Sequence, residues 1–195
     1  MLSKSVPSGT LIPQGSQLQA VNAFGMQAVV AYRRDVVECQ RRTAAGMSPL
    51  TQPDVLDLLM GLPEGESVPV SALSGPERRA LKATPKGAVI QNSRTVTRQA
   101  VQPLRVDLAI VPGRGWESAM EKAESFTPFC ARAVLVERPL RRKGDAMLHA
   151  DFYGIGLLAL VGNELDVLVP PRPFVKRRHT VAGWKFLEDM YAQLA

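Results

Sequence analysis

The segment Leu104-Arg-Val-Asp-Leu-Ala-Ile-Val111 decides what fold we expect for this chain. Apolar residues at 104, 106, 108 and 110 recur every second position, which is the period of a β-strand with one face in a core. Pro112-Gly-Arg-Gly115 then turns the chain, and 116–126 carries apolar residues at helical spacing. The nearly all-apolar segment Ala131–Val136 follows, which is typical of a strand buried in a parallel sheet. The order strand, helix, strand indicates an α/β core.

The same alternation of elements continues toward the C-terminus. We expect a helix over 144–153, a strand over 154–161, a return strand over 165–169 and a last helix over 182–194. These elements predict an α/β (α+β) fold: a central mixed sheet flanked by helices, preceded by a helical N-terminal region.

Toward the N-terminus, residues 16–42 place apolar side chains at steps of three and four and predict one long helix. Its polar side would carry arginines 33, 34, 41 and 42. Its broad apolar surface predicts that it packs between other elements of the fold or forms a homodimer contact. Thr51 and Ser74 each precede a proline and an acid, which predicts two short capped helices. Segments 86–92 and 95–101 then predict a β-hairpin. Two helices followed by a basic hairpin is the order of a winged helix-turn-helix.

Composition narrows the class of protein. Of 195 residues 46% are hydrophobic, enough for a core, whereas aromatics at 6% argue against a stacking platform for single strands. The net charge of +6 favours a polyanionic partner such as nucleic acid. Cys39 and Cys130 lie far apart in apolar stretches, as reduced thiols would. With no membrane-length apolar run and no signal peptide, we expect a cytoplasmic protein.

Three segments resemble the core of the restriction-endonuclease-like (PD-(D/E)XK) superfamily. They are Trp116–Phe126, Ala131–Val136 and Asp151–Leu158, which contains a Gly-Ile-Gly motif. Over 86–169 the expected order is hairpin, strand, helix, buried strand, helix, Gly-containing strand and edge strand. The resemblance implies a fold in which an amphipathic helix connects the active-site strand to a buried strand.

The resemblance also implies a magnesium site, and this chain departs from it. In the family, an acid at one strand end and an acid-x-Lys motif on the next strand hold Mg²⁺, and the lysine orients the attacking water. Here Asp107 matches the acid, but Ala109 stands where lysine is expected, and 94–102 offers no carboxylate. The resemblance therefore implies an inactive member used for binding or assembly, with no metal and no cofactor.

An alternative keeps catalysis with a migrated site. Glu117 and Glu121 are one helical turn apart, and with Lys122 they would complement Asp107 in a Mg²⁺-dependent nuclease. A solvated helix face explains the same residues more simply. A zinc site is not expected, because His149 and His179 are the only histidines and the cysteines are unpaired.

We expect four segments: a lead-in and long helix (1–48), a winged-helix-like segment (49–101), an overlapping nuclease-like core (86–171), and a basic linker with the C-terminal helix (172–195). Basic clusters in the last three supply the candidate nucleic-acid-binding residues. These are Arg78, Arg79, Lys82, Lys86, Arg94, Arg98, Arg138, Arg141, Arg142, Lys143, Arg172, Lys176, Arg177 and Arg178.

The first hypothesis is thus a nucleic-acid-binding protein, with DNA as the expected partner, whose nuclease-like domain is inactive. Its roles would be DNA maintenance, regulation or service as an accessory subunit. A nuclease with a migrated site, and an antitoxin-like or adaptor protein that binds an acidic protein partner, are the alternatives.

Overall fold

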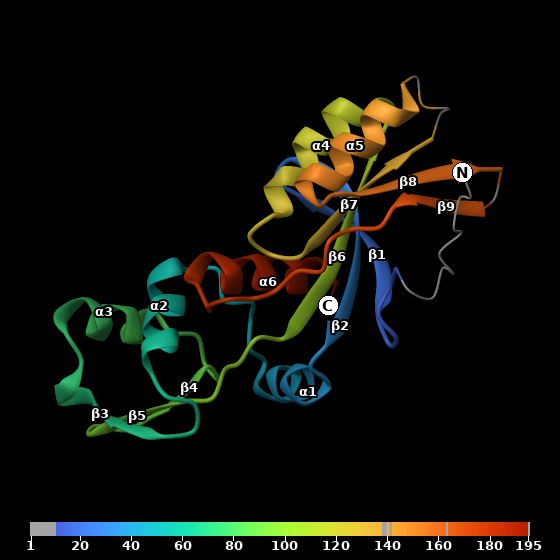
Figure 1. Ribbon diagram of the computed structural model, residues 1–195. Coiled ribbons are helices and arrows are strands. Elements are labelled where there is room, and N and C mark those ends of the chain that lie inside the picture. Colours follow the sequence, from blue (N-terminus) through green and yellow to red (C-terminus); the bar gives the residue numbers. More distant parts are fainter. Residues whose placement is uncertain (1–10, 138–139, 141, 163, 195) are drawn as a thin grey trace. The chain divides into compact units, whose positions relative to one another are not determined.

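The chain folds into two compact units, each built from segments that are distant in the sequence. The computed structural model describes residues 11–137, 140, 142–162 and 164–194 (Figure 1). One unit combines 1–33 with 106–177, and the other combines 34–105 with 178–195. We call them the sheet unit and the helical unit. The functional labels of the four expected segments stay predictions.

The sheet unit is organised around a six-stranded mixed sheet with the order β1-β2-β6-β7-β8-β9. Strands β6, β7 and β8 run parallel, whereas β1–β2 and β8–β9 are antiparallel pairs. The bounds are β1 Gln17–Ala23, β2 Met26–Arg34, β6 Leu104–Gly113, β7 Ala131–Val136, β8 Gly156–Val161 and β9 Glu164–Val169. A mixed sheet flanked by helices was expected, and the structure confirms it.

Two helices, α4 (Trp116–Ala123) and α5 (Lys143–Tyr153), lie side by side on one face of this sheet (Figure 1). A short 3-10 turn, η3 (Glu124–Phe126), follows α4. Close packing of α4 requires glycine at 113, since a Cβ there would lie 2.5 Å from the Cβ of Ala119. These elements confirm the strand-helix-strand order expected from the sequence.

Both faces of β6 are covered. Leu108 and Ile110 pack with Ala133 in an apolar cluster on one face. Ala109 and Val111 are buried as well, although the alternation predicted a single apolar face. Residues 109, 111 and 113 share a face, which α4 covers through Gly113.

The long helix expected over 16–42 was wrong. The segment forms the β1–β2 hairpin and a separate helix, α1 (Val36–Ala45). Phe24 and Gly25 form the turn with φ of 53° and 74°, the pattern of a type I′ turn. Alternate residues of β2, such as Val30 and Tyr32, are buried. Strand burial every second residue mimicked helical spacing here. The homodimer contact expected through this helix therefore loses its structural basis.

The helical unit contains four helices and a small sheet among its described residues. The sheet has the order β3-β5-β4, and all its pairs are antiparallel. The elements are α1, α2 Pro53–Gly61, β3 Ser67–Pro69, η2 Val70–Ala72, α3 Gly75–Ala83, β4 Val89–Gln91, β5 Thr95–Arg98 and α6 Val181–Leu194. The two short helices, the hairpin and the last helix confirm the expectation. Thr51 was wrong as a cap, because α2 begins after Gln52 without a side-chain cap.

A buried ion network joins α1 to α6 in this unit. Arg42 is fully buried and donates from Nη1 and Nη2 to the carboxylate of Glu188 at 2.7 and 2.8 Å. Its Nε donates to Glu38 at 2.7 Å, and Arg41 donates to the same carboxylate. Arg41 and Arg42 are therefore structural residues and not part of a solvated basic face.

Candidate nucleic-acid interface

Helix α3 presents basic side chains to solvent. Ser74 caps it by accepting from the Glu77 amide, and the Glu77 side chain accepts from the Ser74 amide at 2.6 Å, which completes the expected capping box. These hydrogen bonds from Ser74 lower the pKa of Glu77. Ala80 and Leu81 bury the opposite side of the helix against an apolar cluster. The rest of the helix surface is left to solvent.

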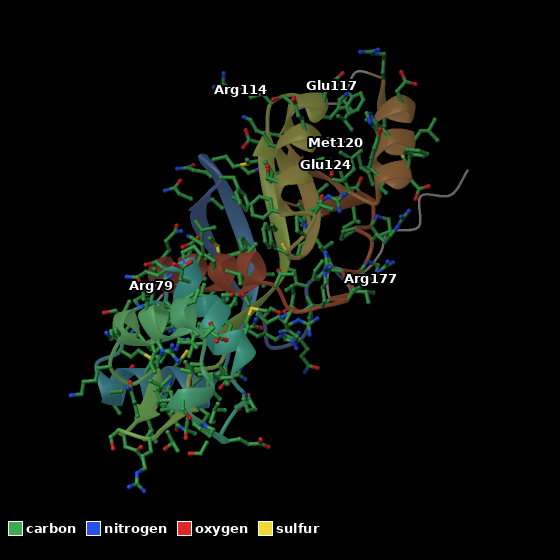
Figure 2. All side chains as sticks on the ribbon, turned by 90° about the vertical axis from the view of Figure 1, so that its left-hand side faces the viewer. Arg79, Arg114, Glu117, Met120, Glu124 and Arg177 are labelled. Atoms are coloured by element: carbon green, nitrogen blue, oxygen red, sulfur yellow. The ribbon has the colours of Figure 1, made fainter. Side chains whose placement is uncertain are left out.

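The exposed side of α3 carries a basic stripe. Arg78, Arg79 and Lys82 are exposed and lie within one face, because residues three and four apart in a helix point the same way. Figure 2 shows Arg79 projecting from the helical unit. Arg78 also donates to the Leu73 carbonyl, which holds its guanidinium near the start of the helix. Arg79 and Lys82 form no ion pair with any residue that the structure describes.

The β4–β5 hairpin holds Arg94 at its tip. Asn92 Oδ1 accepts from the backbone amides of Arg94 and Thr95, each at 2.8 Å, and thereby fixes the turn. The Arg94 side chain is exposed, as is that of Lys86 before β4. These two cations and the basic stripe are the exposed candidate residues of this unit, together with Arg178.

Arg98 has a structural role instead. Its side chain is only 16% exposed, and it donates to the Leu59 carbonyl at 2.8 Å and to Glu64 at 3.1 Å. Its guanidinium also lies over the Trp184 ring, 5.8 Å from the centroid. We therefore leave Arg98 out of the candidate interface.

The sheet unit carries the remaining described candidates on its surface. Arg142 and Lys143 are exposed at the start of α5, and Arg142 lies 3.4 Å from Glu117. Arg172 donates to the Asp151 carbonyl at 3.3 Å. Arg177 is exposed (Figure 2), and so is Lys176 before it. Arg138 and Arg141 lie outside the described residues.

The alternative metal site centres on Asp107, which the structure pairs with arginine. Arg33 donates from Nε and Nη2 to the two Asp107 oxygens at 2.8 and 2.7 Å, and Ser16 donates at 3.2 Å. This hydrogen bonding and charge raise the pKa of Arg33. A bidentate guanidinium occupies the oxygens that a cation would need. Ala109 is buried beside it on the same strand face.

The other members of that alternative lie on α4. Glu117 is near Arg142, and Glu121 and Lys122 are exposed. Among the residues that the structure describes, no three His, Cys, Asp or Glu side chains are grouped so that they could hold a metal ion.

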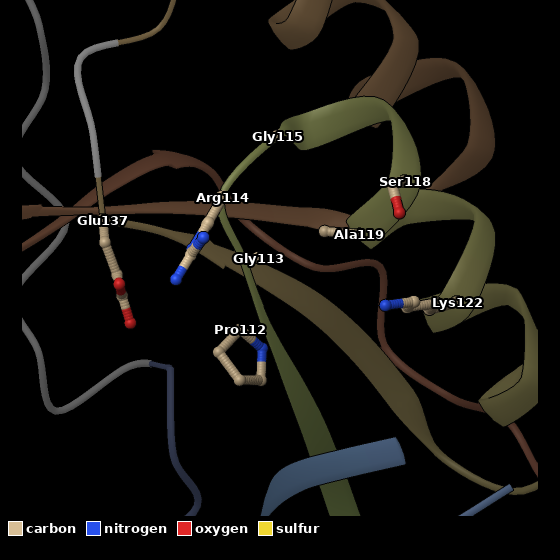
Figure 3. A pocket seen from close by; sticks show the side chains of 8 residues that line it. All are labelled: Pro112, Gly113, Arg114, Gly115, Ser118, Ala119, Lys122 and Glu137. Atoms are coloured by element: carbon tan, nitrogen blue, oxygen red, sulfur yellow. The ribbon is translucent and has the colours of Figure 1, made fainter. Parts of the chain in front are cut away.

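A pocket of about 480 Å³ opens where β6 and β7 end, beside the first turn of α4. Figure 3 shows Lys122 and Ser118 projecting from α4, Arg114 from the turn after β6, and Glu137 after β7. Pro112, Gly113, Gly115 and Ala119 complete its lining. From the sequence, we expected only a turn at 112–115. The usable signal was the meeting of two parallel strand ends, where α/β proteins commonly bind ligands.

Comparison of the chain with protein-family models, with curated proteins and with solved structures gave no match. Within the described ranges, no helix combines the length and apolar character needed to span a membrane.

Proposed function

We propose that this chain is a cytoplasmic DNA-binding protein that contacts double-stranded DNA through α3 and the β4–β5 hairpin. In this proposal the sheet unit is a restriction-endonuclease-like core that does not cleave. The observation that carries the proposal is the exposed basic stripe of α3 beside a hairpin whose tip presents Arg94.

The architecture around this stripe supports a winged-helix-like segment. Helices α2 and α3 pack together, and the hairpin follows α3 directly in a small sheet with the order β3-β5-β4. An α-helix fits the major groove of B-DNA, and a helix of this motif is the element placed there. Arg78, Arg79 and Lys82 would meet phosphates and base edges from one side of α3, and Arg94 would reach the backbone beside them.

The chemistry of these side chains predicts how binding depends on conditions. Contacts between lysine or arginine and phosphate release counterions, so affinity falls steeply with salt. No metal takes part in such contacts, and EDTA is expected to leave binding unchanged.

Two features support a core that binds without cutting. Strands β6 and β7 are parallel and joined by α4, which agrees with the order that the superfamily resemblance implies. On β6, Arg33 neutralises Asp107, and Ala109 stands where the resemblance requires lysine. A lone, neutralised carboxylate is a poor ligand for Mg²⁺.

Fluorescence anisotropy with a labelled duplex at low and moderate salt tests the proposal. The Arg79→Gln/Lys82→Gln variant removes two cations of the stripe, and Arg105→Gln/Lys185→Gln removes two exposed or half-exposed cations elsewhere in the same unit. If both stripe residues contact phosphate, the slope of log K against log salt falls by about 2. The control variant is expected to keep the slope of the unmodified protein.

Absence of duplex binding at low salt would refute the proposal. Equal slopes for the two variants would refute the assignment of the interface to α3. Cleavage of plasmid DNA with Mg²⁺ or Mn²⁺ would overturn the inactive core.

A further inference from the structure

We propose that the pocket at the ends of β6 and β7 binds a terminal phosphate monoester. The inference concerns the sheet unit, not the α3 interface. It rests on the proposed function only if the phosphate is the 5′ end of a nucleic-acid strand. A free nucleotide presents the same chemical group.

The charge of the pocket matches such a group. Arg114 and Lys122 both line it, both are exposed, and neither forms an ion pair with another residue in the described part of the chain. A phosphate monoester carries a charge of roughly −1.5 to −2 at neutral pH, so it can contact both cations, while Glu137 reduces the net charge of the lining to +1. An internal phosphodiester carries only one negative charge and gains less from the second cation.

The shape of the pocket supplies the remaining contacts. Arginine offers a planar fork of donors to phosphate oxygens, and lysine offers a compact charge. Ser118 adds a hydroxyl donor from the first turn of α4, where no side chain caps the helix. The volume of about 480 Å³ lies within the usual range for small-molecule sites.

Glu137 limits what the phosphate can be attached to. Figure 3 shows it on one side of the pocket, with Ser118 and Lys122 on the other. Its carboxylate accepts hydrogen bonds from hydroxyl or amino groups and repels a second phosphate. The ligand that fits is therefore one phosphate on a hydroxyl-bearing skeleton, as in a nucleoside 5′-monophosphate or a 5′-phosphorylated strand end.

Two measurements on the full chain test this site. Anisotropy compares one duplex carrying 5′-phosphate or 5′-hydroxyl ends, and calorimetry titrates adenosine 5′-monophosphate. The pocket variants are Arg114→Gln and Lys122→Gln. The control Lys185→Gln removes a half-exposed cation of the helical unit that neither lines the pocket nor belongs to the candidate interface. We expect the phosphorylated duplex to bind about tenfold tighter, and each pocket variant to lose that preference.

The outcomes separate this inference from the DNA-binding proposal. Suppose that the mononucleotide binds the unmodified protein but not the pocket variants, while the duplex binds equally with 5′-phosphate and 5′-hydroxyl ends. This result supports the site with a small-molecule ligand. Mononucleotide binding with no duplex binding overturns only the proposed function. Equal binding of both duplex ends, with no heat from the mononucleotide, overturns only the inference. Loss of the preference in Lys185→Gln as well overturns the assignment to the pocket.

Discussion

Replacement of Glu188 by alanine is the sharpest test of how the helical unit is held together. Glu188 is fully buried on α6. Besides the two hydrogen bonds from Arg42, its carboxylate accepts from the Leu50 amide at 3.0 Å and from Trp184 Nε1 at 2.9 Å. The side chain thus joins α6 to α1 and to the loop before α2.

The cost of this change follows from what remains buried. Arg42 keeps Glu38 and the Val101 carbonyl as acceptors but loses both hydrogen bonds to Glu188 at zero exposure. Removing one partner of a buried ion pair costs about 3–5 kcal/mol. The orphaned Leu50 and Trp184 donors add to this cost, because an unsatisfied buried donor costs about 1–3 kcal/mol. Against a typical total stability of about 5–15 kcal/mol, the unit would be close to unfolding.

Urea unfolding followed by tryptophan fluorescence measures this effect. Trp184 lies in the helical unit and Trp116 in the sheet unit, so a Trp116→Phe background isolates the relevant signal. With an m-value of about 2 kcal/mol per molar, the midpoint falls by about 2 M. Glu188→Gln retains an acceptor oxygen and is expected to lose less.

Asp189→Ala is the matched control on the same helix. Asp189 pairs with Lys185 at 2.8 Å, with side chains 39% and 41% exposed. Exposed pairs contribute about 0.3–0.5 kcal/mol, so the midpoint should move by only a few tenths molar. A shift for Glu188→Ala no larger than for Asp189→Ala would refute the stabilising role of the network.

Two further predictions concern titratable groups. Burial raises the pKa of the Cys130 thiol to about 12, so iodoacetamide at about pH 8 should leave it unmodified until urea unfolds the chain. Peptide mass spectrometry checks this, and rapid native labelling would contradict it. Burial alone would raise the pKa of Glu38, but hydrogen bonds from Arg41 and Arg42 lower it overall. Its stabilising contribution is therefore complete above the ordinary glutamate value of about 4.3 and is lost as pH falls through the lower folded value. The urea midpoint should fall as the pH is lowered below about 4, and it should fall less steeply in Glu38→Gln. Equal dependence of the midpoint on pH in the two proteins would contradict this role of Glu38.

Local patterns predicted the elements that depend on local physics. Ser74 and Glu77 are three residues apart and sufficed to place the start of α3. The run at 131–136, apolar except for Arg132, matches β7 residue for residue, because a strand covered on both faces is rich in apolar side chains. The basic residues of α3 were also identified from the sequence, since charge and helical spacing are local properties.

The helix predicted over 16–42 was wrong because the local pattern is ambiguous, and only the pairing of strands resolves the ambiguity. Apolar residues over 16–42 satisfy helical and strand periods alike, and Phe24-Gly25 was the overlooked turn signal. The segment forms strands because β1 and β2 pair with each other as an antiparallel hairpin. Helical spacing cannot predict a strand whose partners lie elsewhere in the chain.

Only the tertiary structure shows which charged side chains are exposed and able to contact a partner. Arg42 and Glu188 are 146 positions apart, and Arg33 and Asp107 are 74 positions apart, so no local sequence pattern predicts either ion pair. The pocket around Arg114 and Lys122 likewise exists only because β6 and β7 end together. The sequence by itself determined the secondary structure of most segments and the surplus of positive charge. Long-range packing determined which of those charges remain on the surface, because ion pairing and burial depend on neighbours that the chain brings together only when it folds.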